Sequence, residues 1–259
     1  MPDACPGVTT GAGGVSVGRR CAPEWPIVDG VLEPVAFELS RRSSALDAVH
    51  WRLQALDVPE GVSVYLRGGM LEQMEPHPGA DIDVIVLGPA ERAKAVAGQV
   101  NGSLSALGRP IEAVPCAPEV LQAHVPLRML VQCRALLVGG HGVTLPPLRA
   151  DEPLRRSLWN FYAPFLLRHS LQGPLSARLV TVKYALRAVG VLGLFEGRYS
   201  RDLPTCLGWC ERYAPEARAI LERALLGLEE PEPAPLDLRP ALVALEQAYV
   251  HLSNIRGRV

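Results

Sequence analysis

The chain has 259 residues, of which 48% are hydrophobic and 20% charged, and its formal net charge is −1. This is the composition of a folded globular protein with room for one large or two ordinary domains. The lack of a basic excess argues against a processive nucleic-acid polymerase, which needs a surface that neutralises phosphates.

The chain carries no pattern of a secreted or membrane protein. It lacks a basic segment followed by an apolar core near its start, and no apolar run reaches the roughly 20 residues of a membrane span. Its six cysteines are scattered, as is typical of reduced thiols rather than a disulfide framework. We therefore expect a cytoplasmic protein with no membrane partner, either a monomer or a homodimer.

The first half of the chain alternates predicted strands and helices. Residues 1–35 are rich in Gly and Pro and predict an irregular extension, in which a short strand near Val28–Leu32 is the one regular element considered. From there to 150, apolar periodicity predicts helices at 40–56, 89–107, 118–124 and 127–134, and strands at 62–66, 81–87, 109–114 and 135–142. We expect residues 36–150 to form one domain around a small mixed sheet.

The second half predicts helices only. Pro146, Pro147 and Pro153 mark the change of pattern, and helices are expected near 153–171, 174–195, 202–212, 215–229 and 238–255. We expect residues 151–259 to form an all-α bundle, which gives an α+β protein of two domains with a cleft between them.

The most informative stretch is VSVYLRGGMLEQMEPHPGADIDVIVL at 62–87. Asp81 and Asp83 are two positions apart on a predicted strand, so their carboxylates point to one face and repel each other unless a cation lies between them. Gly68 and Gly69 form a turn whose backbone can approach phosphate oxygens closely. A third acid, Glu112, lies inside the strand RPIEAV, where burial without a partner would be costly, and completing a metal site would explain it.

These residues match the pattern of a known family. The series RGG…DIDVIV…PIEAV resembles the DNA polymerase β-type nucleotidyltransferase fold, with its glycine turn, paired acids and third acid on a later strand. The resemblance covers about residues 60–140. A small catalytic domain followed by a helical bundle is similar in layout to the aminoglycoside adenylyltransferases of the streptomycin and spectinomycin type.

The resemblance implies a chemistry and its cofactors. Asp81, Asp83 and Glu112 would hold Mg²⁺, as a two-metal site, and Glu112 would either bind metal only or act as the general base. Gly68 and Gly69 would contact the nucleotide. The donor would be ATP, as is usual in the family that the chain resembles. The acceptor would be a hydroxyl-bearing small molecule such as an aminoglycoside.

The glycine turn lacks the hydroxyl and the cation that meet the phosphates in many relatives, so another cation is needed. Arg67 precedes the turn, at a position where the side chain can point into the core. Lys183, one of only two lysines, is therefore preferred, with Arg187 one turn later on the same face of a predicted helix.

Two alternatives stay open at this point. One is a nucleotidyltransferase that acts on tRNA or on a protein, as toxin-like and antitoxin-like relatives do. The other is a nucleotide-binding protein that has lost catalysis.

Overall fold

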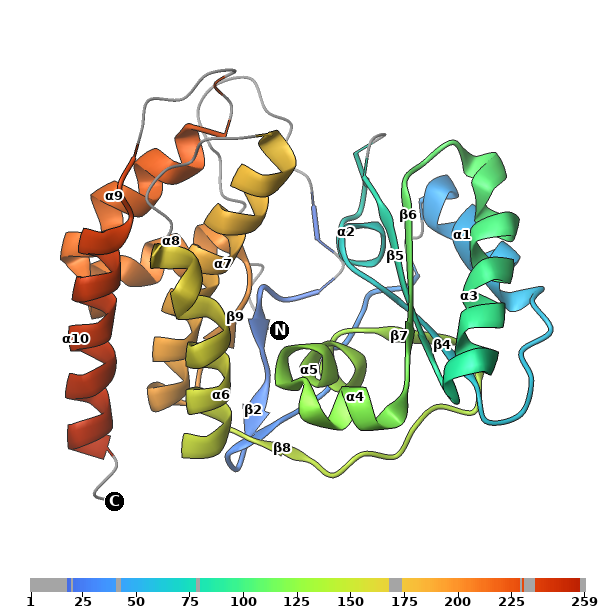
Figure 1. Cartoon of the computed structure of the whole chain (residues 1–259), viewed down its shortest axis with the longest axis horizontal. Helices are drawn as coiled ribbons and strands as arrows, with labels where there is room; N and C mark the ends of the chain where they lie inside the picture. The colour runs from blue at the N-terminus through green and yellow to red at the C-terminus, as the bar shows by residue number, and fades with distance from the viewer. Residues whose placement is uncertain are drawn as a thin grey trace. The chain divides into compact units, whose positions relative to one another are not determined.

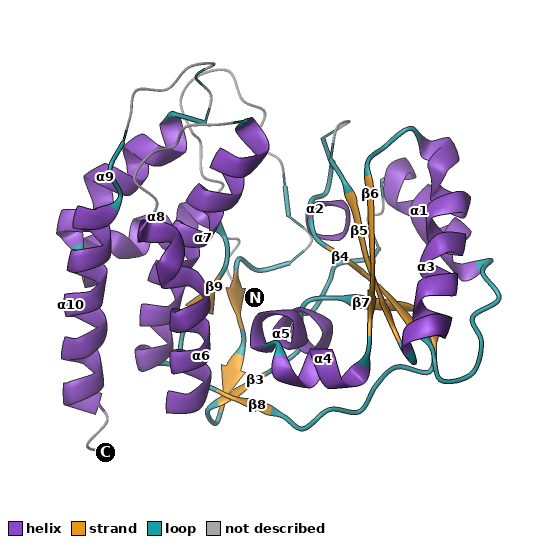
Figure 2. Cartoon of the chain, viewed as in Figure 1, coloured by secondary structure: helices purple, strands orange, loops and turns teal. Residues whose placement is uncertain are grey.

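The computed structural model describes residues 18–19, 21–40, 43–77, 80–167, 174–228, 230 and 236–256. The chain has an α+β fold (Figures 1 and 2) and divides into two compact units. Unit 1 contains residues 1–22 and 35–146, and unit 2 contains residues 23–34 and 147–259. The division near 146 lies close to the predicted change of pattern, whereas the segment 23–34 belongs to unit 2 rather than to a separate extension.

Unit 1 is built on a four-stranded mixed sheet with the strand order β6-β5-β4-β7. Its strands are β4 (Ser63–Arg67), β5 (Ile82–Leu87), β6 (Ile111–Cys116) and β7 (Leu136–Gly140). β4 pairs antiparallel with β5 and with β7, while β5 and β6 run parallel. Parallel strands need a crossover connection, and helix α3 (Ala90–Leu104) with the 3-10 turn η1 (Ser105–Leu107) provides it.

Helices cover both faces of this sheet (Figure 1). One face packs on α1 (Ser44–Gln54) and α3 through the strand residues Val64, Leu66, Ile82, Val84 and Val86. The other face presents Tyr65, Ile85 and Leu87 to α4 (Pro118–Ala123) and α5 (Val125–Cys133). Because side chains alternate along a strand, Arg67 and Asp83 lie on this second face, beyond the apolar cluster.

Unit 2 is mainly helical. It contains α6 (Glu152–Tyr162), η2 (Ala163–Leu167), α7 (Leu175–Gly193), η3 (Leu194–Glu196), α8 (Leu203–Tyr213), α9 (Pro215–Leu226) and α10 (Arg239–Arg256). The predicted helices are all present, with shorter ends where the pattern was extended too far. None of the described helices is both long and apolar enough to cross a membrane.

The expectation of an irregular N-terminal extension was wrong for residues 24–32, where three short strands form and only one, near Val28–Leu32, was expected. The otherwise helical second half also contains a short strand at 199–200. β1 (Glu24–Trp25) pairs with β9 (Tyr199–Ser200), and β2 (Ile27–Val28) and β3 (Val31–Leu32) form a sheet with β8 (Leu148–Arg149). Trp25 packs edge-on against Tyr199, with ring centroids 5.2 Å apart. Two-residue strands carry too little periodicity to be seen in the sequence. The expected irregular part at 1–17 lies outside the described residues.

Candidate functional site

Three charged residues lie in one row across three neighbouring strands of unit 1. Arg67 at the end of β4 is the register partner of Asp83 on β5, and Asp83 is the register partner of Glu112 on β6. Residues directly opposite each other in a sheet share a face. Asp81 lies one residue before β5 and two residues before Asp83. Its side chain therefore shares the face of Asp83, just before the strand begins.

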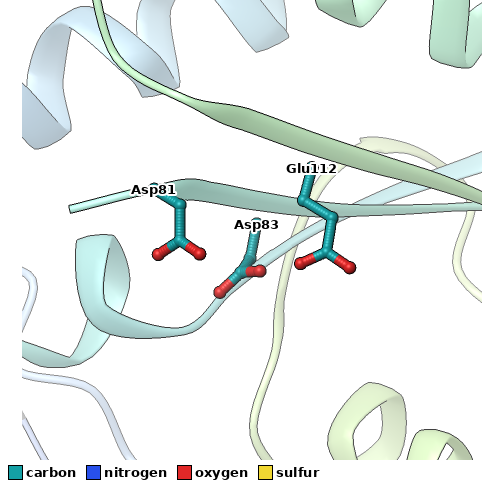
Figure 3. Close-up of side chains that lie close together, drawn as sticks. All are labelled: Asp81, Asp83 and Glu112. Carbon is teal, nitrogen blue, oxygen red and sulfur yellow. The ribbon is translucent and has the colours of Figure 1, made fainter. Parts of the chain in front are cut away.

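The structure brings the three predicted acids together. Asp81, Asp83 and Glu112 each offer a carboxylate oxygen, and these oxygens all lie within 4.8 Å of one another. Figure 3 shows the three carboxyl groups pointing to the same side. Nearby positive charge stabilises a cluster of this kind, and the three oxygens are close enough together to hold one cation.

The three acids differ in exposure. The side chain of Asp83 is 11% exposed, whereas Asp81 is exposed and the side chain of Glu112 is 58% exposed. Glu112 is therefore exposed on its strand, so the cost of burying an acid does not account for its presence there. β6 is an edge strand of the sheet, and of its residues only Cys116, at the end, is buried.

The glycine turn shapes the site around Asp83. Gly68 adopts φ +77° and ψ −160°, a backbone conformation that is essentially restricted to glycine. A methyl group on its Cα would overlap the Asp83 Oδ2 atom and stand 3.1 Å from Cγ. Gly69 begins the short helix α2 (Gly69–Glu72). Only a glycine at position 68 lets the Asp83 carboxylate lie directly against the turn.

Arg67 is the site residue whose place the sequence analysis misjudged. Its Nη2 atom lies 3.2 Å from Asp83 Oδ1 and 3.6 Å from Glu112 Oε2, and the side chain is 18% exposed. The side chain therefore lies among the acids rather than in the apolar core. The two-residue period of β4 could have predicted this position, because it places Arg67 and Tyr65 on the same face of the sheet, the face that Asp83 also occupies.

The pKa of Asp83 reflects this mixed environment. Burial raises the pKa to about 7, while the Arg67 guanidinium opposes the rise. The Glu112 carboxyl, through a hydrogen bond, and the charges of Asp81 and Glu112 raise it further. Arg67 alone therefore compensates only part of the negative charge, and a bound cation would complete it.

A second ion pair stabilises α2, the short helix that follows the glycine turn. Arg134, whose side chain is only 4% exposed, donates from Nε and Nη2 to the two carboxylate oxygens of Glu72, each at 2.9 Å. This bidentate pair fixes the end of α2 against the residue that follows α5. The Glu72 carboxylate is therefore bound to Arg134 rather than directed at the glycine turn.

The chain before Asp81 is tied to the start of β6. Arg109 donates from Nη1 to the carbonyl oxygens of His77 (2.7 Å) and Ala80 (3.3 Å). The backbone N–H of Ile82 donates to the carbonyl of Pro110 at 2.8 Å. These bonds hold Asp81 beside the strand that carries Glu112.

Unit 2 places the two predicted phosphate ligands on α7. Lys183 and Arg187 are both half-buried there. The Arg187 guanidinium lies 5.6 Å from the Tyr184 ring centroid, and its Nε donates a long bond of 3.5 Å to the Arg201 carbonyl. Burial, together with the charge of Arg201, lowers the pKa of Arg187 to about 10. No carboxylate among the described residues pairs with Arg187, and sequence reasoning had not connected Arg201 with it.

Two acids of unit 2 have structural partners. Glu196 forms an ion pair with Arg212 at 2.7 Å and accepts a hydrogen bond from the Tyr213 hydroxyl at 2.9 Å. Asp202 caps α8 by accepting from the Thr205 N–H at 3.2 Å.

No protein-family model and no curated protein matches the chain. Among solved structures, it is similar to spectinomycin adenyltransferase AAD(9) from Enterococcus faecialis, whose crystal structure contains ATP and spectinomycin. The match covers 82% of this chain and 99% of that chain, with a TM-score of 0.47 and 14% identity. At this distance the likeness transfers no residue role or substrate to the present chain.

Proposed function

We propose that this protein is a Mg²⁺-dependent nucleotidyltransferase. It transfers a nucleoside monophosphate to a hydroxyl group of a small molecule and releases pyrophosphate. The donor is ATP, so the transferred group is AMP. The observation that supports this best is the convergence of Asp81, Asp83 and Glu112 beside a glycine turn, with ligand oxygens within 4.8 Å of one another. The order of these parts along the chain is also that of the polymerase β-type pattern.

The donor set fits Mg²⁺. Carboxylate oxygens are its preferred protein ligands, and Mg²⁺ usually binds one or two of them together with substrate phosphates. Asp83 offers a buried carboxylate whose charge Arg67 compensates only in part. When bound, the ion would stabilise the charge that develops on the phosphate oxygens during transfer.

The side chains have separate roles in this proposal. Asp81 and Asp83 hold the metal ion. Glu112 completes the ligand set and, because its side chain is 58% exposed, can accept the proton of the attacking hydroxyl. Gly68 and Gly69 leave room for the phosphates beside Asp83.

The phosphates also need positive charge from the protein. Lys183 and Arg187 are our candidates, because both lie on α7 and Arg187 has no carboxylate partner among the described residues. A small hydroxylic acceptor such as an aminoglycoside is favoured over tRNA, because a net charge of −1 provides no general attraction for a polyanion.

Pyrophosphate release tests this function. The protein is incubated with Mg²⁺ and each of the four NTPs in turn, across a panel of aminoglycosides and with tRNA. The double variant Asp81→Asn with Asp83→Asn removes two charges with little change of shape, and Asp57→Asn, an exposed acid after α1, is the matched control.

We expect acceptor-dependent release with ATP, retained in the control and abolished in the double variant. Release that persists in the double variant would show that these acids are not the catalytic centre. Release with tRNA alone would move the acceptor to nucleic acid. Mg-ATP binding without any release would identify a nucleotide-binding protein.

A further inference from the structure

We propose that Arg67 takes the place of a second metal ion, so that the site holds one divalent cation instead of two. This inference rests on the proposed metal site at Asp81, Asp83 and Glu112. It concerns how many ions that site binds.

The position of Arg67 follows from strand register. Arg67, Asp83 and Glu112 are successive partners across β4, β5 and β6, so their side chains share one face and one row. A single nitrogen, Nη2, lies 3.2 Å from a carboxylate oxygen of Asp83 and 3.6 Å from one of Glu112. The guanidinium thus bridges the two acids that come from different strands.

Burial gives this bridge its importance. The Arg67 side chain is 18% exposed and that of Asp83 is 11% exposed, so water screens their charges only partly. The Arg67 Nε atom is buried and has no hydrogen-bond partner. Its hydrogen bonding is therefore incomplete, and the opposite charges of the two acids provide the compensation for burying this cation.

Charge balance points to one ion. Asp81, Asp83 and Glu112 carry three negative charges when ionised, and Arg67 supplies one positive charge. The remaining charge of −2 matches a single divalent cation. A second divalent ion between Asp83 and Glu112 would meet the guanidinium at close range, which is strongly unfavourable in a partly buried site.

The test counts bound ions rather than turnover. Mn²⁺ prefers the same oxygen ligands as Mg²⁺ and can be counted by electron paramagnetic resonance. The wild-type protein, Arg67→Met, Arg67→Lys and the control Arg92→Met are titrated with Mn²⁺ alone. Arg92 is a suitable control because it lies on α3 and donates to the Glu60 carbonyl, away from the acids.

We expect one Mn²⁺ per wild-type, Arg67→Lys and Arg92→Met chain. Arg67→Met should bind two Mn²⁺ ions, because the positive charge that excludes the second ion is removed. Two Mn²⁺ ions in the wild type would overturn the inference whether or not the variants fold. A single Mn²⁺ ion in folded Arg67→Met would also overturn it, whatever its affinity, as would loss of Mn²⁺ binding.

The outcomes separate this inference from the proposed function. If no Mn²⁺ binds to wild type or Arg67→Met, both the metal assignment and the inference fail. If Arg67→Met behaves as expected but no NTP yields pyrophosphate, the inference on Arg67 stands and nucleotidyl transfer fails.

Discussion

Replacing Gly68 by alanine should damage the metal site more than the fold. The Gly68 backbone has φ +77° and ψ −160°, where a non-glycine residue costs about 1–3 kcal/mol. The added methyl group would also overlap Asp83 Oδ2 and stand 3.1 Å from Cγ and 3.3 Å from Cβ. Overpacking of this kind typically costs about 1–3 kcal/mol more. The sum of about 2–6 kcal/mol is a large part of a domain's usual stability but need not unfold it.

Gly108 provides the matched control. It has φ +64° and ψ +23°, in the ordinary left-handed region, and a methyl group there would meet nothing within 4 Å. Gly108→Ala should therefore cost only the conformational term of about 1–2 kcal/mol.

The assay combines urea unfolding with Mn²⁺ titration of both variants. Gly68→Ala should be the less stable by at least about 1 kcal/mol, since only Gly68 is crowded. It should also bind Mn²⁺ more weakly than wild type, because Asp83 must move. Gly108→Ala should bind Mn²⁺ like wild type. Equal stability losses together with unchanged Mn²⁺ binding in Gly68→Ala would refute the claim that this glycine positions Asp83.

Three further predictions follow from the same geometry. Because the folded state raises the pKa of Asp83 to about 7, the metal-free protein holds that proton more tightly than the unfolded chain does. Its contribution to stability should thus be full at low pH and decline as pH rises toward 7, by up to about 1.4 kcal/mol per pH unit, and the pH profile of Asp83→Asn in urea unfolding should lack this decline. Glu72→Gln should cost about 3–5 kcal/mol in unfolding free energy, because it leaves the buried Arg134 without its carboxylate partner; a loss below 1 kcal/mol would contradict the structural role of the pair. Glu112→Gln should lower kcat by roughly 100-fold or more while stability stays near wild type, since this exposed carboxyl contributes to proton transfer rather than packing; unchanged kcat would exclude Glu112 as the base.

Local patterns in the sequence predicted most helices and the strands of the sheet. The apolar period of α1 and α3 is strong because each helix buries one face along its length. β5 was recognised instead as a nearly continuous apolar run, because it is buried on both faces. Of the short strands at 24–32, only one near Val28–Leu32 was expected. β2 pairs locally with β3, whereas β1 and β3 also pair with residues far along the chain, at 199–200 and 148–149. Pairing between such distant segments leaves no local period.

The candidate site was likewise predicted from the sequence only in part. The spacing of Asp81 and Asp83 already placed two carboxylates on one face, since that depends only on the two-residue period of a strand. The sequence also singled out Glu112, although for a burial that the edge strand does not provide.

Only the tertiary structure decided how these acids are compensated. Strand register sets Arg67 beside Asp83 and Glu112, and no spacing along the chain encodes which residues become neighbours across a sheet. The sequence by itself determined the acidic groups of the site and the face that Asp81 and Asp83 share. The paired strands decided which charges meet, because register is fixed by the packing of the whole sheet on its helices.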